Sequence, residues 1–344
     1  MKIKTVYMDI EEVLAQPVQQ HVYPKRPNIF FRMLLRVVSA PDLKATNFKY
    51  REFEMEKLGE KEPCLVLMNH SSFIDLKIAS TVFYPRPLNI VCTSDGFVGK
   101  ERLMRSLGCI PTRKFVTDTQ LVRDMMFALK KLKSSILMYP EASYTFDGTA
   151  TPLPAGLGKC IKLMGVPVVM IRTYGAFARD PLYNGLRLRK VDVSADISYI
   201  LSPEDIRTKT AEDINGILYE QFSFDNFKWQ QDVKISEPFR AEGLNRVLYK
   251  CPHCGAEGSM ESGGADILCN ACGKGYTLTE YGFMEAKEGK TEFPHIPDWY
   301  AWERDCVRQE ILKGSYKLDV PVVHIHDGKY QKGIRYRRRQ ADPW

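Results

Sequence analysis

The sequence predicts an α/β domain with a mixed, mostly parallel sheet flanked by helices, followed by a small cysteine-rich module. Two observations favour this fold class. Between Pro63 and Ile171, short apolar runs of strand length alternate with helix-like segments, which is typical of a parallel sheet covered by helices. Around Arg246 the composition changes to glycine, cysteine and short polar segments. A chain of 344 residues is long enough for one full core and a smaller module.

The first domain is expected to contain at least four strands and four helices. The strands are predicted at residues 64–68, 88–92, 135–139 and 166–171, because each is a continuous apolar run short enough for a strand buried on both faces. The helices are predicted at residues 73–83, 100–107, 119–132 and 158–164, with Ser71 or Ser72 as the N-cap of the first.

An amphipathic helix is predicted to start at Ile29, with Asn28 as its N-cap. Its apolar residues follow helical spacing, and Arg32 and Arg36 interrupt the apolar run (IFFRMLLRVV, residues 29–38). Two interpretations remain open: a helix lying in a membrane interface, and a core helix whose arginines face water. No window has the roughly 18–20 apolar residues of a spanning helix.

The charge is distributed unevenly. Residues 1–200 hold 29 basic and 19 acidic side chains, whereas residues 201–300 hold 10 and 17. A basic first part indicates attraction to an anionic partner: nucleic acid, phospholipid headgroups or a phosphorylated small molecule. The alternative is a solvated basic surface without a partner. The overall composition, with 44% apolar and 26% charged residues, excludes a disordered chain and a multispan membrane protein.

The N-terminal segment MKIKTVYMDIEEVL carries acids where a secretory signal would be apolar, so we expect no signal peptide. A cytoplasmic, reducing compartment follows from that expectation. In such a compartment a tight cysteine cluster indicates a metal site more often than disulfides.

A His and an Asp five positions apart follow the first predicted strand, in the Asn-His-x4-Asp sequence of residues 69–75. A strand–turn–helix can fold Asp75 back onto the imidazole of His70. The carboxylate would then fix the tautomer and leave the other ring nitrogen free to take a proton from a hydroxyl. The alternative is a hydrogen-bonded turn histidine without a catalytic role.

Four ordered blocks resemble the glycerolipid acyltransferase family, of the lysophosphatidic acid (1-acyl-sn-glycerol-3-phosphate) acyltransferase type. They are the Asn-His-x4-Asp sequence of residues 69–75, LGCIPTR at 107–113, YPEASY at 139–144, and GVPVV at 165–169. The third block resembles the family sequence Phe-Pro-Glu-Gly-Thr-Arg. The resemblance spans about residues 61–193.

This resemblance implies transfer of a fatty acyl group from acyl-CoA or acyl carrier protein to a hydroxyl. It makes His70 the general base and Asp75 its orienting partner, without a covalent acyl-enzyme. It also implies a substrate-binding group of side chains, namely Asn69, Arg113, Glu141 and Ser143. From the residues alone, a surface arginine is the favoured interpretation of Arg113. Glu141 is equally well interpreted as a helix-capping acid.

The third block departs from the family sequence at two positions. Ala142 replaces a glycine and so gives up its backbone freedom. Tyr144 replaces the arginine that the family uses near the acceptor phosphate. Either another cation takes over this role, with Lys159 and Lys114 as candidates, or the acceptor differs from lysophosphatidic acid.

Two C-x-x-C pairs predict a zinc ribbon with a structural Zn²⁺ ion. The ligands are Cys251, Cys254, Cys269 and Cys272, because four thiolates at this spacing close a tetrahedral site with no open position for substrate. A rubredoxin-like iron site or loss of the metal is the alternative. The ribbon lies in the acidic segment, so we expect no nucleic acid as a partner.

The predicted domains are residues 1–245 (acyltransferase, with its amphipathic helix), 246–284 (zinc ribbon) and 285–344 (C-terminal extension). The predicted function is acylation of a lysophospholipid, 1-acyl-glycerol-3-phosphate first among them, in phospholipid biosynthesis. The predicted location is peripheral, on the inner face of the cytoplasmic membrane, with the membrane surface as a partner. The alternatives are acylation of another lipid hydroxyl, and a non-catalytic zinc-ribbon binding protein.

Overall fold

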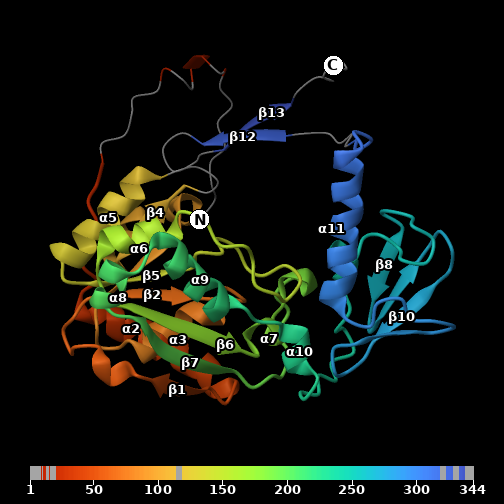
Figure 1. The fold of residues 1–344 in the computed structure, drawn as a ribbon, viewed down its shortest axis with the longest axis horizontal. Helices are drawn as coiled ribbons and strands as arrows, with labels where there is room; N and C mark the ends of the chain where they lie inside the picture. The colour runs from red at the N-terminus through yellow and green to blue at the C-terminus, as the bar shows by residue number, and fades with distance from the viewer. Residues whose placement is uncertain are drawn as a thin grey trace.

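A seven-stranded sheet forms the centre of the first domain, in the order β1-β7-β6-β2-β5-β3-β4 (Figure 1). The computed structural model describes residues 21–113, 118–317, 323–327 and 333–337, with Asp9, Glu11, Glu12 and Ala15 near the N-terminus. The strands of this sheet are β1 (Lys49–Phe53), β2 (Leu65–Met68), β3 (Leu88–Thr93), β4 (Cys109–Thr112), β5 (Ser135–Met138), β6 (Val168–Tyr174) and β7 (Ser194–Leu201).

The sheet is mixed and mostly parallel, as predicted. Strands β6, β2, β5, β3 and β4 are parallel to their neighbours in this group. Strand β7 is antiparallel to β6, and the edge strand β1 is parallel to β7. The sequence did not predict β1, β4 or β7. All five residues of β1 are exposed, so it has no apolar run to reveal it, and Pro111 lies inside β4.

Helices cover both faces of the sheet (Figure 1). They are α2 (Ile29–Ala45), α3 (Ile74–Val82), α4 (Glu101–Ser106), α5 (Thr119–Lys130), α6 (Leu157–Met164), α7 (Ala176–Arg179), α8 (Pro203–Thr208), α9 (Ala211–Phe222) and α10 (Asn226–Gln230). Short 3₁₀ helices occupy Met55–Lys57, Ser94–Phe97, Leu182–Asn184 and Leu244–Arg246. One core packs α2 and α3 against one face of the sheet, and a second core packs α5, α6, α8 and α9 against the other.

The start of α3 differs from the prediction. Its N-cap is Phe73, which makes no side-chain capping bond. Neither Ser71 nor Ser72 is the N-cap; instead, the carboxylate of Asp75 in the first turn accepts from the backbone N–H groups of both serines.

Helix α2 begins at the predicted residue, with the Asn28 side chain accepting from the N–H of Phe31, but it continues to Ala45. The apolar residues Phe30 and Val37 are 57% and 61% exposed, whereas Leu43 of the same helix is buried in the core. Arg32 donates to the carbonyl oxygen of Pro85, and the exposed Arg36 lies 4.7 Å from the ring centre of Tyr84. The helix thus presents apolar side chains to the outside, and its place at a membrane interface stays a prediction.

The C-terminal module packs a four-stranded antiparallel sheet against a long helix, beside the end of the large sheet towards which β6 points (Figure 1). Its elements are β8 (Met260–Gly263), β9 (Asp266–Cys269), β10 (Gly275–Leu278), β11 (Met284–Ala286) and α11 (Ile296–Leu312). A single core joins Trp299 of α11 and Tyr276 of the ribbon to Phe177 and Phe227 of the first domain. The boundary predicted at residue 284 therefore falls inside β11, and α11 shares the core of the ribbon.

A final hairpin consists of β12 (Val323–Asp327) and β13 (Gly333–Arg337). The predicted strand that carries His324 and His326 is thus present, while the side chains of both residues lie outside the described part of the chain. Among the described residues, no helix is both long and apolar enough to cross a membrane.

Candidate functional site

The imidazole of His70 and the carboxylate of Asp75 form a hydrogen-bonded pair at the carboxyl end of β2. Nδ1 of His70 lies 3.1 Å from Oδ2 of Asp75. The His70 side chain remains 22% exposed, whereas that of Asp75 is fully buried. When Asp75 accepts from Nδ1, Nε2 of His70 is left as an acceptor for a substrate proton.

Asp75 is held by the turn that precedes its own helix. The same Oδ2 atom accepts hydrogen bonds from the backbone N–H groups of Ser71 (2.7 Å) and Ser72 (3.0 Å). An ionised carboxylate is the natural acceptor for three donors. These bonds fix the carboxylate relative to the imidazole, so the orientation of His70 is set by the local strand–turn–helix.

The third sequence block wraps around His70. The ring of Tyr139 stacks on the imidazole with a centroid distance of 4.0 Å, and the ring of Tyr144 lies against it at 4.4 Å. The N–H of Thr145 donates to the carbonyl oxygen of His70 at 2.8 Å. Burial raises the pKa of Tyr139 well above its ordinary value and that of Tyr144 to about 12, so both phenols are neutral near pH 7.

Glu141 connects this block to the turn that carries His70. Its Oε2 accepts from the N–H of His70 (2.8 Å), and its Oε1 accepts from the N–H of Thr151 (2.7 Å). Burial raises the pKa of Glu141, and these two backbone donors partly offset that rise. Both carboxylate oxygens are engaged by the backbone, so in this structure Glu141 acts on the position of His70.

The other predicted substrate-binding residues lie in different surroundings. Oδ1 of Asn69 is buried and accepts from the N–H (2.8 Å) and hydroxyl (3.2 Å) of Thr173 on β6. Arg113 follows β4 and is 63% exposed, with Nε 3.8 Å from Asp118. Ser143 is exposed in the third block. The order of strands puts Arg113 three strand spacings, roughly 14 Å, from His70. Of the two candidate cations, Lys159 is exposed on α6 and Lys114 lies outside the described residues.

A buried polar cluster behind Asp75 was not predicted. Oδ1 of Asp75 has no hydrogen-bond partner among the described residues, and the hydroxyl of Ser72 lies against the carboxylate of Asp180. Asp180, which follows α7, lies beside them and pairs with Arg179 at 3.3 Å. Burial raises the pKa of Asp180 to about 6, and the negative charge of Asp75 contributes to the rise. No sequence motif marks this cluster, because Asp180 is 105 residues from Asp75 in the sequence and meets it only in the folded chain.

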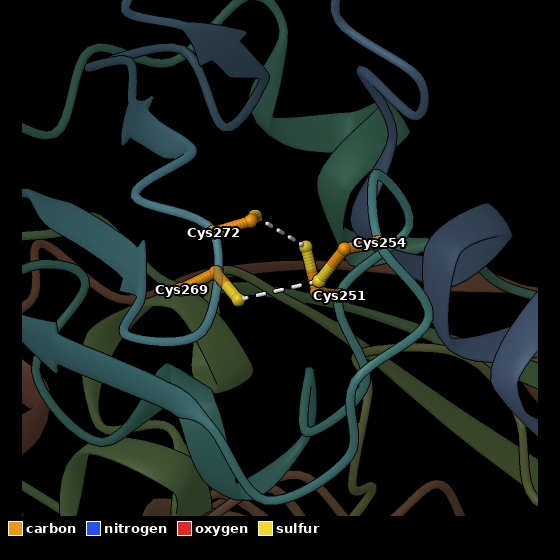
Figure 2. Close-up of side chains that lie close together, drawn as sticks. All are labelled: Cys251, Cys254, Cys269 and Cys272. Atoms are coloured by element: carbon orange, nitrogen blue, oxygen red, sulfur yellow. Dashed lines mark hydrogen bonds between the residues drawn. The ribbon is translucent and has the colours of Figure 1, made fainter.

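The four cysteines of the ribbon converge as predicted (Figure 2). The Sγ atoms of Cys251 and Cys272 are 3.8 Å apart, as are those of Cys254 and Cys269, and all four lie within 4.8 Å of one another. Four sulfurs placed about 2.3 Å from a tetrahedral ion would be about 3.8 Å apart. The donor set therefore fits a closed four-thiolate metal site.

Each cysteine pair sits in a tight turn that ends in glycine. Gly255 and Gly273 both have a φ of +77°, a conformation that glycine adopts without strain. Their N–H groups bond back to the carbonyls of Cys251 and Cys269. His253 is exposed inside the first turn and contacts Glu292 at 3.2 Å rather than a thiol.

Comparisons with known proteins place the first domain. The acyltransferase family model matches residues 50–173, which contain all four sequence blocks, and this match confirms the predicted acyltransferase resemblance for that part of the chain. The chain is also similar to PlsC, the 1-acyl-sn-glycerophosphate (LPA) acyltransferase of Thermotoga maritima, over 55% of this chain and 76% of that one, with 14% identity and a TM-score of 0.44. No curated protein gives a significant match.

Proposed function

Because residues 50–173 of this chain belong to the acyltransferase family, we propose that its first domain transfers a fatty acyl group from a thioester to the hydroxyl of a lysophospholipid. The observation that carries the proposal is the hydrogen bond between His70 and the buried Asp75 at the end of β2. Acyl-CoA or acyl carrier protein is the donor, and 1-acyl-glycerol-3-phosphate is the first acceptor to test.

The reaction needs one proton transfer in each direction. Nε2 of His70 takes the proton of the acceptor hydroxyl while its oxygen forms a bond to the thioester carbonyl carbon. The imidazolium is stabilised by the buried carboxylate of Asp75. When the carbon–sulfur bond breaks, His70 returns the proton to the leaving thiolate. The products are the ester and the free thiol.

Replacing the base tests this mechanism. We expect His70→Ala to lower kcat by 10²- to 10⁴-fold, measured as thiol release with mass spectrometry of the lipid product. His253→Ala is the matched control, because His253 is exposed on the ribbon and makes its polar contact to Glu292. Unchanged turnover in His70→Ala would overturn the mechanism and favour a non-catalytic binding protein.

A second acceptor class is favoured by Tyr144. A half-buried phenol lies against His70 where the family block has arginine, and the cation that would meet an acceptor phosphate is missing from that position. We therefore include acylation of an uncharged lipid hydroxyl as the alternative. A panel of lyso-acceptors with and without a phosphomonoester separates the two: a strong preference for acceptors without the phosphomonoester would reject 1-acyl-glycerol-3-phosphate.

We further propose that the enzyme docks on the inner face of the cytoplasmic membrane through α2. The outer face of α2, defined as Phe30, Met33, Leu34 and Val37, is 38–61% exposed and points away from the contacts of α2 with α3. Burying such side chains in the interfacial layer of a bilayer is favourable. Val37→Ser with Phe30→Ser should weaken vesicle binding, while Leu163→Ser, on the opposite face of the sheet, should not. Equal binding by both variants would exclude α2 as the attachment site.

The role proposed for the cysteine site is structural zinc binding. Its four thiolates leave no open position for substrate, so no chemical step passes through the metal. One zinc ion per chain in the purified protein is the expected content, and iron in its place would support the rubredoxin-like alternative.

A further inference from the structure

A basic groove runs beside the outer face of α2. Its volume is about 520 Å³, and it lies between the C-terminal half of α2, the turn into β1 and the end of α3. The groove is lined by the cations Arg36, Lys44 and Lys49, by the apolar side chains of Leu43 and Phe48, and by Thr81.

The three cations are available to an external anion. Across the described residues, none of them forms an ion pair with a carboxylate. The nearby acids have other partners: Asp42 pairs with Lys77 and Arg179, and Asp192 accepts from Asn47. Arg36 also stacks on Tyr84, which holds its guanidinium at the rim without neutralising it. The groove therefore carries a net positive charge.

We propose that this groove binds the phosphate of an anionic phospholipid in the bilayer on which the enzyme docks. The apolar outer face of α2 lies next to the groove, so a single lipid layer can meet both: acyl chains against Met33 and Val37, and a phosphate against Lys44 and Lys49. The charge of the groove selects an anionic headgroup over a zwitterionic one. This inference rests on the membrane docking proposed above and adds the lipid class that is recognised.

Vesicle binding of the full chain tests the groove. The variant is R36Q/K44Q/K49Q, and the probes are phosphatidylcholine vesicles with and without 30% phosphatidylglycerol. Because each surface cation contributes about one factor of five to binding an anionic membrane, we expect a loss on the order of a hundredfold on the phosphatidylglycerol vesicles. On pure phosphatidylcholine we expect little change. The matched control R123Q/K130Q/K131Q removes one Arg and two Lys that are exposed on α5, across the sheet.

The outcomes separate the groove from the catalytic proposal. Equal losses of vesicle binding in the test and control variants would show that only the total charge of the protein matters, and would overturn the proposal that the groove binds lipid. Unchanged vesicle binding of the test variant would overturn the proposal too. A selective loss of binding supports the groove even if acyl transfer is never detected. Turnover of the variant in detergent micelles should stay at the wild-type value, because the three cations do not contact His70 or Asp75.

A second, independent observation concerns the C-terminal module. The loop of residues 139–151 surrounds His70, and its far side contacts the module: the ring of Phe146 lies 5.4 Å from that of Tyr300 on α11. The turn before α10 links the same loop to the C-terminal module. Asp225 forms a β-bridge with Thr149 and pairs with His295 at 3.0 Å.

From these contacts we infer that the C-terminal module positions the loop that holds His70. Tyr300 and Asp225 are positioning residues and do not touch the reacting atoms. The path is short: Phe146 lies next to Thr145, whose N–H bonds to the carbonyl of His70. A packed contact at one end of the loop thus restricts the backbone at the other.

Removing the aromatic contact tests this positioning. We expect Tyr300→Ala to lower kcat about tenfold with little change in KM, and to speed hydrogen exchange at the amides of Thr145 and Thr151. Tyr300→Phe should restore both, since the ring carries the contact. The control is Tyr316→Ala, an exposed tyrosine beyond α11. Wild-type kcat and exchange in Tyr300→Ala would overturn the inference.

Discussion

The turn that pairs His70 with Asp75 and the four-cysteine cluster both hold a few polar side chains in fixed geometry, but in opposite ways. In the cluster, all four cysteines fall between Cys251 and Cys272, and neighbouring strands of the surrounding sheet are consecutive in the sequence. Around His70, the partners come from distant segments: Glu141 is 71 residues away, and Asn69 reaches Thr173 across 104 residues. The local cluster depends on two short turns, whereas the distributed site depends on the whole sheet.

The largest expected effect is on the local site. Cys251→Ser removes one of four ligands, and structural zinc contributes on the order of 10 kcal/mol to the folding of small zinc domains. We expect the zinc content to fall from one per chain to near zero and proteases to cleave within residues 246–317. Cys160→Ser, a half-buried cysteine outside the cluster, should keep its metal. One zinc per chain in Cys251→Ser would contradict the assignment.

The catalytic pair should respond in rate rather than in folding. In Asp75→Asn, a neutral amide replaces the carboxylate that accepts from Nδ1 of His70 and from two backbone N–H groups. The imidazolium formed during the reaction is then no longer stabilised by a negative charge. We expect kcat to fall on the order of a thousandfold, with the zinc content unchanged. Steady-state kinetics and metal analysis on the same sample check both. A loss of zinc together with activity would mean that the two regions do not act separately.

Replacing Glu141 should affect both the catalytic rate and the stability of the fold. In Glu141→Gln, one backbone N–H faces an NH₂ group instead of an oxygen, which leaves a buried donor unpaired at a cost of about 2 kcal/mol. We expect a lower free energy of unfolding and a lower kcat. Ser143→Ala, two residues along and exposed, serves as the comparison. If Ser143→Ala lowers kcat by more than Glu141→Gln does, the acceptor contact lies at Ser143.

The buried cluster behind Asp75 predicts a pH effect on stability. Burial raises the pKa of Asp180 to about 6 from its ordinary 3.8. Between these values the folded chain binds more protons than the unfolded one, so this residue lowers the free energy of unfolding as the pH rises from about 4 to 6. Asp180→Asn should reduce that fall by about 1 kcal/mol. Urea unfolding at pH 4.5 and 7 measures it, and identical pH slopes would count against a buried, titrating Asp180.

The smallest effect is expected at Ala142. Its φ of +59° lies in the left-handed region, which costs a residue with a Cβ about 1 kcal/mol. Ala142→Gly relieves this strain but adds freedom to the unfolded chain, for a net stabilisation of about 0.5 kcal/mol. Thermal unfolding checks the sign. A drop in Tm would show that the surroundings favour the alanine.

Much of the fold was predictable because the central strands are continuous apolar runs. Strands β2, β3, β5 and β6 start within two residues of the predicted positions. The edge strand β1 was not predicted, because all five of its residues are exposed and its sequence, KYREF, contains no continuous apolar run. The boundary predicted at residue 284 missed that β11 completes the ribbon sheet, because this depends on the pairing of β11 with β10.

The candidate site divides in the same way. The pairing of His70 with Asp75 was predictable, because five residues in a strand–turn–helix bring the two side chains together. The two hydrogen bonds that Glu141 accepts, from the N–H groups of His70 and Thr151, were not predictable, because they depend on β5 lying next to β2. The stacking of Tyr139 and Tyr144 on the imidazole arises from the same adjacency.

The sequence by itself determined the features that depend on local spacing: the class of sheet, the His–Asp turn, the acyltransferase blocks and the four-cysteine cluster. Only the tertiary structure decided which way α2 faces, which acids hold the turn that carries His70, and that the ribbon shares a core with the first domain. The physical reason is that local features depend on backbone geometry within a few residues. Exposure, burial and long-range hydrogen bonds depend on which segments the completed sheet places side by side.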